Sequence, residues 1–178
     1  EADGRNDDVA QLLAASSMTP PPECVNPFLY APAIAPHIAA REVGRPIDIA
    51  VIQRAFSQLR ELADVVWVEG VGGFRVPLDE KRDTADLAQA LALPIVLVVG
   101  MRLGCLNHAL LTAEAIARRG LTLAGWVANR IDPTMARFAE NLRTLRDRLS
   151  APLLGVTPYG APPDQAAREL RVDDLAGF

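Results

Sequence analysis

Length, composition and charge narrow the class of protein before any motif is considered. The chain has 178 residues, which suits one compact domain over 1–178, and half of them are apolar, yet no apolar run reaches the ~20 residues that span a bilayer. With 18 basic against 22 acidic side chains, no basic tract and a polar start (EADGRNDD), the chain is unlike a membrane, secreted or nucleic-acid-binding protein, so we expect a cytoplasmic one.

The first third of the chain predicts helices around an irregular excursion. Residues 7–16 have a helical pattern, whereas residues 17–46 hold seven of the 14 prolines and predict a long loop with one short helix near 37–43. Asp48 then resembles an N-cap for a helix in which apolar residues repeat at helical spacing through residues 49–63.

Four apolar runs follow, at residues 65–70, 95–100, 121–129 and 152–158. Uninterrupted Val, Ile and Leu without polar alternation indicate strands that are covered on both faces, as in parallel sheets. Helical patterns at 83–91, 108–119 and 133–149 separate them. This alternation predicts an α/β fold with an open, doubly wound, mostly parallel sheet and right-handed crossovers.

The chain begins on a helical pattern, with no strand before it. Because the first strand of such a sheet usually runs through its centre, we expect the domain to be incomplete at its N-terminus, with a first βαβ unit of ~30 residues or more upstream.

In open α/β sheets ligands bind beyond the carboxyl ends of the strands, and the first such end carries an acid. Glu69 is followed by Gly70, Gly72 and Gly73. A carboxylate here can hold Mg²⁺, and glycines let backbone N–H groups approach phosphate oxygens. A solvated acid before a tight turn would give the same pattern.

The second strand end leads through Gly100 and Gly104 to a helix that we expect to begin near Asn107. Free N–H groups at a helix N-terminus suit a phosphate or carboxylate, although an ordinary loop capped by Asn107 is the alternative. His108 fits a surface residue of the first turn better than a catalyst.

The remaining candidates are polar or flat groups at the last two strand ends. Asn129 can hydrogen-bond a base edge or form a turn, and residues 158–160 (Pro-Tyr-Gly) can form a wall against a purine or a simple turn. Asp7 or Asp8 is either an N-cap or a second Mg²⁺ ligand. Two cysteines, Cys24 and Cys105, fit no metal spacing and suit reduced packing residues.

Taken together, the ordered segments EGVGG, RLGCLNHALLT, LAGWVAN and PLLG, preceded by RNDD, VNPFLYAPAIAPH and AAREVG, resemble the dethiobiotin synthetase family over residues 5 to about 160. The resemblance implies a P-loop NTPase fold and a homodimeric ligase with the substrate near the interface. It also implies that ATP and Mg²⁺ are used to join CO2 to 7,8-diaminopelargonate, giving dethiobiotin, ADP and phosphate.

The resemblance assigns roles by position. It implies Asp8 and Glu69 as the Mg²⁺ carboxylates and a substrate-carboxylate site made across the dimer by backbone N–H groups of Gly104, Cys105, Leu106 and Asn107, with Asn141 where some members have a tyrosine. The implied nucleotide contacts are Asp8, Glu69, Gly70, Val71, Gly72, Asn129, Arg130, Pro158, Tyr159, Gly160 and, more weakly, Gln165.

The family's GxxxxGK[ST] motif is not found, and the single lysine, Lys81 in DEKRD, cannot belong to it. No catalytic residue is therefore identified, and we expect the family's functional lysines in an upstream segment. Two other interpretations remain open: a P-loop-less binding or dimerisation module, and a cobyrinate amidotransferase-type relative. The motifs do not distinguish ATP from CTP or other nucleoside triphosphates.

Overall fold

The computed structural model describes residues 6–175. By its internal contacts the chain divides into two compact units, one up to Leu91 and the other from Ala92 onward, and each is described by itself. The organisation of residues 1–178 as one ligase domain stays a prediction. Among the described residues no helix is both long and apolar enough to cross a bilayer.

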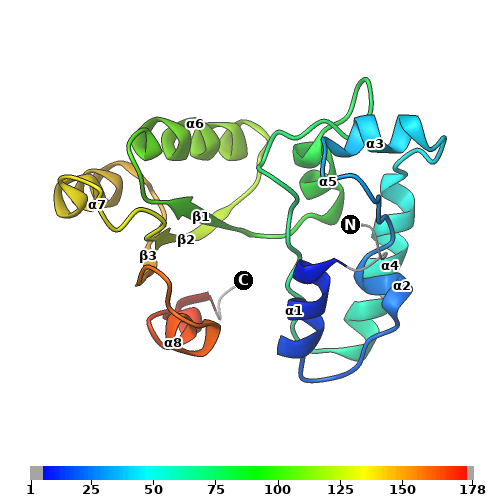
Figure 1. The fold of residues 1–178 in the computed structure, drawn as a ribbon, viewed down its shortest axis with the longest axis horizontal. Coiled ribbons are helices and arrows are strands. Elements are labelled where there is room, and N and C mark those ends of the chain that lie inside the picture. Colours follow the sequence, from blue (N-terminus) through cyan, green and yellow to red (C-terminus); the bar gives the residue numbers. More distant parts are fainter. Residues whose placement is uncertain (1–5, 176–178) are drawn as a thin grey trace. The chain divides into compact units, whose positions relative to one another are not determined.

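Helices form the regular structure of the first unit (Figure 1). Ala40, Ile47, Ile49 and Leu78 form its buried apolar cluster. The helices are α1 (Asp7–Ala15), α2 (Pro22–Val25), α3 (Pro36–Glu42), α4 (Ile49–Leu62) and α5 (Thr84–Leu91).

Side-chain caps fix where two of these helices begin. The Asp48 carboxylate accepts the Ala50 N–H at 2.9 Å, so the predicted cap of α4 is confirmed. At α1 the cap is Asn6, whose Oδ1 accepts the Val9 N–H at 3.0 Å. The prediction that Asp7 or Asp8 caps this helix is therefore wrong, because both lie inside its first turn. Negative side chains there interact favourably with the positive end of the helix dipole.

The prediction of a buried strand at residues 65–70 is also wrong. This segment has no regular secondary structure, and Val65 and Trp67 are 68% and 62% exposed. A strand forms only where a neighbouring strand accepts its backbone hydrogen bonds. Within the described part of the first unit, the sole β-type pairing is the isolated bridge between Pro77 and Asp83, so the apolar run has no partner.

The second unit contains a parallel three-stranded sheet in the order β1-β2-β3. The strands are β1 (Ile95–Gly100), β2 (Leu123–Asn129) and β3 (Leu153–Thr157), and the helices are α6 (Cys105–Arg118), α7 (Phe138–Arg148) and α8 (Pro163–Arg168), followed by a short 3-10 helix, Val172–Leu175.

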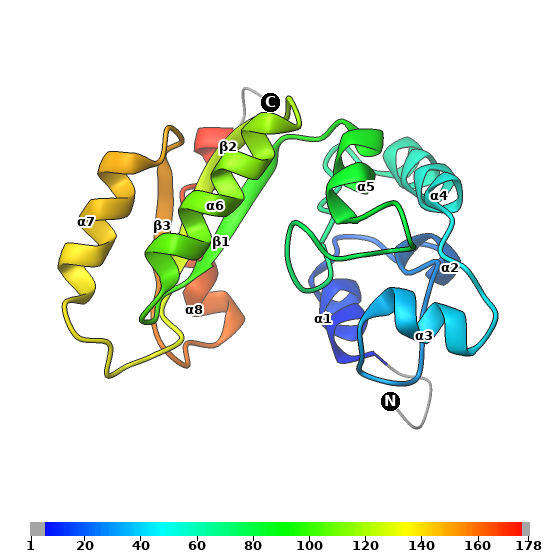
Figure 2. The same ribbon diagram turned by 90° about the horizontal axis from the view of Figure 1, so that it is seen from above.

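Helices lie on both faces of this sheet: α6 is above it and α8 below it in Figure 1, and Figure 2 shows α6 in front of the strands. Trp126 and Leu145, both fully buried, join α6, α7 and the sheet in one apolar cluster that also holds Cys105. On the other side, backbone near Glu169 packs against Gly155 of β3. The predicted α/β fold with a parallel sheet and helices on both faces is thus confirmed.

Two helices of this unit begin elsewhere than predicted. α6 begins at Cys105 with Gly104 at the cap position, so Asn107 lies inside the first turn and does not cap it. α7 begins only at Phe138, because the Asp132 carboxylate accepts the Thr134 N–H in a turn and Arg137 adopts left-handed backbone geometry, with φ of 58°.

Candidate functional site

The carboxyl ends of the three strands form one row. The register pairs Gly100 with Asn129, and Asn129 with Thr157. The Met101 N–H donates to the Asn129 carbonyl at 2.7 Å, and the Arg130 N–H donates to the Thr157 carbonyl at 3.1 Å. Three of the four predicted strand ends therefore meet at one edge of the sheet, where ligands bind in folds of this kind.

Helix α6 begins at Cys105, five residues after Gly100, and the glycine at its cap position has left-handed backbone geometry. Gly104 has φ of 95°, a conformation that L side chains rarely adopt. Cys105 donates its N–H to the Arg102 carbonyl, whereas the N–H groups of Leu106 and Asn107 have no acceptor among the described residues. Two unpaired donors at the positive end of a 14-residue helix suit an anion.

The Cys105 side chain does not share in this donor site. It is 1% exposed and packs in the apolar cluster between the sheet and helices α6 and α7, and neither cysteine forms a disulfide. Cys24 is also buried, at 6% exposed. The prediction that both cysteines serve as packing residues is confirmed, so Cys105 can contact a ligand only through its backbone.

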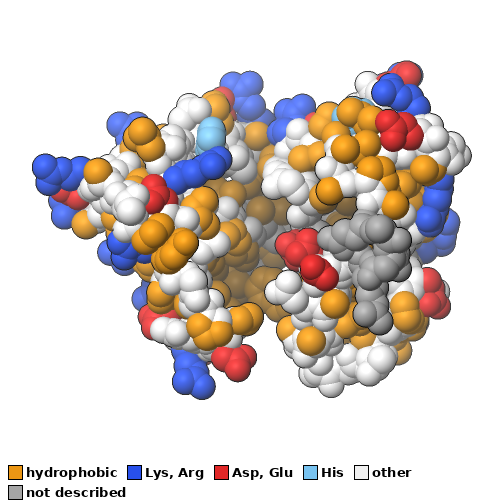
Figure 3. Space-filling view, in the orientation of Figure 1, with side chains coloured by type: hydrophobic (Ala, Val, Ile, Leu, Met, Phe, Trp, Pro, Cys, Tyr) orange, Lys and Arg blue, Asp and Glu red, His pale blue; other side chains and the backbone are white. Residues whose placement is uncertain are grey.

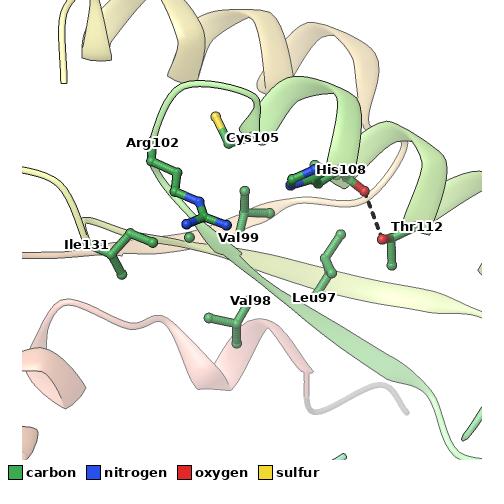
Figure 4. Close-up of a pocket in the computed structure, with 10 residues that line it drawn as sticks. Leu97, Val98, Val99, Arg102, Cys105, His108, Thr112 and Ile131 are labelled. Atoms are coloured by element: carbon green, nitrogen blue, oxygen red, sulfur yellow. Dashed lines mark hydrogen bonds between the residues drawn. The ribbon is translucent and has the colours of Figure 1, made fainter. Parts of the chain in front are cut away.

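An open pocket of about 170 Å³ lies between β1 and α6 (Figure 4). Leu97 and Val99 supply its apolar floor, and Arg102, Cys105 and His108 line the side toward α6. In Figure 4 the Arg102 guanidinium points into this space, and the His108 carbonyl accepts the Thr112 hydroxyl at 2.8 Å. The pocket therefore combines an apolar floor with one cation beside the α6 N-terminus.

The segment that follows β3 turns sharply and leaves an aromatic ring in solvent. Tyr159 is 58% exposed, Gly160 has φ of 66°, and the Ala161 N–H returns to the Pro158 carbonyl at 3.3 Å. Gln165 lies on α8 and is exposed. An exposed ring two residues after the end of β3 is able to cover one face of a planar ligand.

Arg130 and Asn141 are held by their own surroundings. The Arg130 guanidinium lies over the Phe138 ring, 5.0 Å from its centroid, and donates to the Pro133 carbonyl at 3.2 Å. The Asn141 amide donates to the Arg137 carbonyl at 2.9 Å. Both side chains thus stabilise the loop that leads into α7, and any ligand contact would come in addition to this role.

In the first unit, the Glu69–Gly72 loop is anchored from its C-terminal side by Thr84. Thr84 is buried, at 8% exposed. Its hydroxyl donates to the Gly73 carbonyl at 2.9 Å and accepts the Val76 N–H at 2.9 Å. Gly72 has φ of 74°, so the loop turns where glycine is needed. Glu69 and Val71 are exposed, which leaves the loop accessible to a ligand.

Asp8 and Glu69 supply hard oxygen donors of the kind that Mg²⁺ prefers. Both side chains are exposed, and neither carboxylate has an ion-pair or hydrogen-bond partner among the described residues. Residues 6–175 contain no group of three or more His, Cys, Asp or Glu side chains that could hold a metal ion. Because Mg²⁺ usually keeps several waters and phosphate oxygens, one or two carboxylates fit its chemistry, and the shared ion stays a prediction.

Basic side chains do not gather on the face that Figure 3 shows, where Lys and Arg are scattered among acidic and apolar groups. The absence of a nucleic-acid partner stays a prediction.

Comparison with known proteins identifies the family. The model of an AAA domain family matches residues 1–166. The ATP-dependent dethiobiotin synthetase BioD of Aromatoleum aromaticum is 63% identical over 169 residues, which cover 94% of this chain and 75% of that protein. The chain belongs to the ATP-dependent dethiobiotin synthetase family. Proteins of the same name from Janthinobacterium sp. and Nitrosospira multiformis are each 54% identical, over 94% and 92% of this chain and 71% of their own length.

Membership of the dethiobiotin synthetase family makes the protein a ligase of biotin biosynthesis with a P-loop NTPase type of fold and ATP as co-substrate. The resemblance seen in the sequence is confirmed. The interpretations as a non-catalytic module and as a cobyrinate amidotransferase-type relative give way to this one.

Sequence reasoning missed two residues at the candidate site. Arg102 stands inside the RLGCLNH motif, and a cation just before the glycine that opens a helix was the available signal. Thr157, whose hydroxyl donates to the Asn129 side chain at 2.8 Å, gave no signal because its partner is 28 residues away in the chain.

Proposed function

We propose that the full-length protein catalyses the ATP- and Mg²⁺-dependent carboxylation and ring closure of 7,8-diaminopelargonate with CO2, giving dethiobiotin, ADP and phosphate. The observation that carries this proposal is the 63% identity, over 94% of this chain, to a protein named ATP-dependent dethiobiotin synthetase. The row of strand ends and the α6 N-terminus support the assignment of residues to parts of the reaction.

The reaction bonds both amines of the substrate to the carbon atom of CO2. One substrate amine adds to CO2 and loses a proton, which gives a carbamate. The γ-phosphoryl group of ATP passes to a carbamate oxygen with departure of ADP, and the second amine then attacks the activated carbon and expels phosphate. Positioning and charge neutralisation carry most of the catalysis in phosphoryl transfer, so the chain's task is to bind and orient these partners.

The nucleotide base is bound at the β2 and β3 ends. The Asn129 amide offers a donor and an acceptor to the base edge, and residues 158–160 with the Tyr159 ring cover one face, with Gln165 as a further contact. Arg130, stacked on Phe138, stiffens the loop next to Asn129. Backbone N–H groups of the Glu69–Gly72 loop contact the phosphates.

The substrate carboxylate binds the free N–H groups of Leu106 and Asn107 at the α6 N-terminus. The Arg102 guanidinium adds positive charge beside them, and the apolar floor of the pocket suits the alkyl chain of the substrate. The protein acts as a homodimer in which this site serves the partner subunit's reaction centre.

Asp8 and Glu69 would hold the magnesium ion. When bound, Mg²⁺ neutralises charge that develops on the transferring phosphoryl group. Neither carboxylate exchanges protons with the substrate in this scheme; each acts as an oxygen ligand.

Incorporation of labelled bicarbonate into dethiobiotin by the full-length protein tests the proposal. We expect labelled product only with 7,8-diaminopelargonate, ATP and Mg²⁺ together, and one ADP per dethiobiotin. Product that forms equally without ATP, or no product at all, would reject the proposed reaction.

A further inference from the structure

The side chain of Asn129 is held by a neighbouring hydroxyl. Thr157 donates its hydroxyl proton to Asn129 Oδ1 at 2.8 Å, in a partly buried position at the edge of the sheet. The two residues are register partners on adjacent parallel strands, so the contact joins the ends of β2 and β3. An amide that would otherwise choose between two orientations therefore has a specific partner for its oxygen.

The backbone on both sides of this contact is fixed. The Asn129 carbonyl accepts the Met101 N–H at 2.7 Å, and the Thr157 carbonyl accepts the Arg130 N–H at 3.1 Å. Neither residue can shift without breaking the sheet, whereas the terminal torsion of an asparagine amide is intrinsically soft. The orientation of the Asn129 amide is thus set by its side-chain partner.

The orientation of an amide decides which base edge it can read. With Oδ1 turned toward Thr157, the Nδ2 group keeps both its protons for a ligand, and Oδ1 keeps one lone pair. A flipped amide would instead donate one Nδ2 proton to the Thr157 oxygen and turn Oδ1 toward the base, which would reverse the order of donor and acceptor that the base meets. A fixed amide pairs with a base that presents a donor beside an acceptor in the matching order, as the 6-amino group and ring nitrogen of adenine do.

We propose that Thr157 is a positioning residue that locks the Asn129 amide in the orientation that selects a 6-amino over a 6-oxo purine nucleotide. This inference rests on the proposed binding of the nucleotide base at Asn129, and it names a residue that sets nucleotide selectivity without touching the base. Thr157 directly precedes residues 158–160, which are proposed to contact one face of the base. One short segment therefore contacts the base and also orients the Asn129 amide that binds the edge of the base.

The test compares ATP with ITP, which carries an oxygen in place of the 6-amino group. Dissociation constants of both nucleotides are measured by titration calorimetry on the full-length protein, for the wild type, Thr157→Val, which keeps the shape, and Thr157→Ser, which keeps the hydroxyl. We expect Thr157→Val to reduce the preference for ATP over ITP by about 3- to 10-fold, the range of one net hydrogen bond. Thr157→Ser should retain most of the preference for ATP. In steady-state turnover, Thr157→Val should raise the KM for ATP by a larger factor than it lowers kcat.

Asn129→Ala distinguishes the inference from the proposed site. If Thr157 acts through Asn129, Thr157→Val should have no further effect on the ATP preference in an Asn129→Ala background. A preference that survives Thr157→Val but is lost in Asn129→Ala would overturn the inference and leave the base site standing. Unchanged affinity for both nucleotides in Asn129→Ala would overturn the base site itself, and the inference with it.

Discussion

At the scale of single residues, Asp79 shows how local donors set the charge of a side chain. Its Oδ1 accepts the N–H groups of Lys81 and Arg82, each at 2.7 Å, and its Oδ2 accepts the Arg82 guanidinium at 2.6 Å. The Lys81 N–H first, and then the Arg82 donors, lower the pKa of Asp79 to about 2. The charged carboxylate thereby closes the turn that precedes α5.

This turn predicts a pH dependence. Because the pKa of Asp79 is lower when folded than in an unfolded chain, its contribution to stability is complete above pH ~4 and is lost as the pH falls toward 2. Carboxyl NMR titration should give a pKa near 2 for Asp79, and the difference in urea midpoint between wild type and Asp79→Asn should shrink from pH 4 to pH 2. A difference that stays constant over this range would contradict the assignment.

Glu69 is one of the two carboxylates proposed to hold the magnesium ion. In the full-length protein, Glu69→Gln should lower Mg²⁺-dependent turnover on the order of 10²-fold or more, because the amide lacks the charge that holds the ion near the phosphates. Steady-state assays over a range of Mg²⁺ concentrations measure this loss. Glu80→Gln removes another exposed carboxylate and serves as the matched control. Near-normal turnover of Glu69→Gln would show that Glu69 is not a metal ligand.

At the scale of elements, β3 depends on a close approach by the segment after α8. A Cβ at Gly155 would lie 2.1 Å from the Glu169 carbonyl oxygen and 2.9 Å from Leu170 Cδ2. The Arg171 N–H donates to the Leu154 carbonyl at 2.9 Å, and its guanidinium donates to the Leu153 carbonyl at 2.6 Å. Backbone contacts, together with the Leu170 and Arg171 side chains, therefore join these two segments.

Gly155→Ala should destabilise the protein by about 1–3 kcal/mol, because the methyl group meets backbone that cannot rotate away. Gly100→Ala is the matched control in the same sheet, since the methyl group there meets only the flexible end of Ile131. Urea denaturation compares the two variants. Equal stability of both would mean that the segment after α8 yields freely.

At the scale of the whole molecule, each compact unit has its own apolar cluster. Trp126 and Leu145 are fully buried in the larger one, where the β1-β2-β3 sheet meets α6 and α7, whereas a smaller cluster around Ile47 and Leu78 supports the first unit. The strand ends with Asn129 and Thr157 are thus carried by the larger cluster, and their geometry depends on its packing.

Leu145→Ala should lower the free energy of unfolding by about 2–5 kcal/mol, the cost of a cavity in a close-packed core. Leu103, which is 95% exposed, gives the control Leu103→Ala with little effect on stability. Thermal denaturation of the two variants measures the difference. A Leu145→Ala protein as stable as the control would place Leu145 outside the core.

The sequence alone determined the parts of this protein whose signals are local. The apolar runs at β1, β2 and β3 lie within two residues of the predicted bounds, and the Asp48 cap was correct, because these features depend on neighbouring residues in the chain. The ordered motifs identified the family for the same reason. They also predict that Asn129 lies at a strand end and that a helix N-terminus follows the strand end at Gly100.

Features that need a distant partner become visible only once the chain is folded. Residues 65–70 have the same apolar character as the other runs, yet a strand requires neighbouring backbone, and the described residues of the first unit supply none. The hydrogen bond from Thr157 to Asn129 joins residues 28 positions apart, and the close contact at Gly155 depends on the segment that follows α8. Such contacts leave no periodic pattern, because their geometry arises only when separate segments pack together.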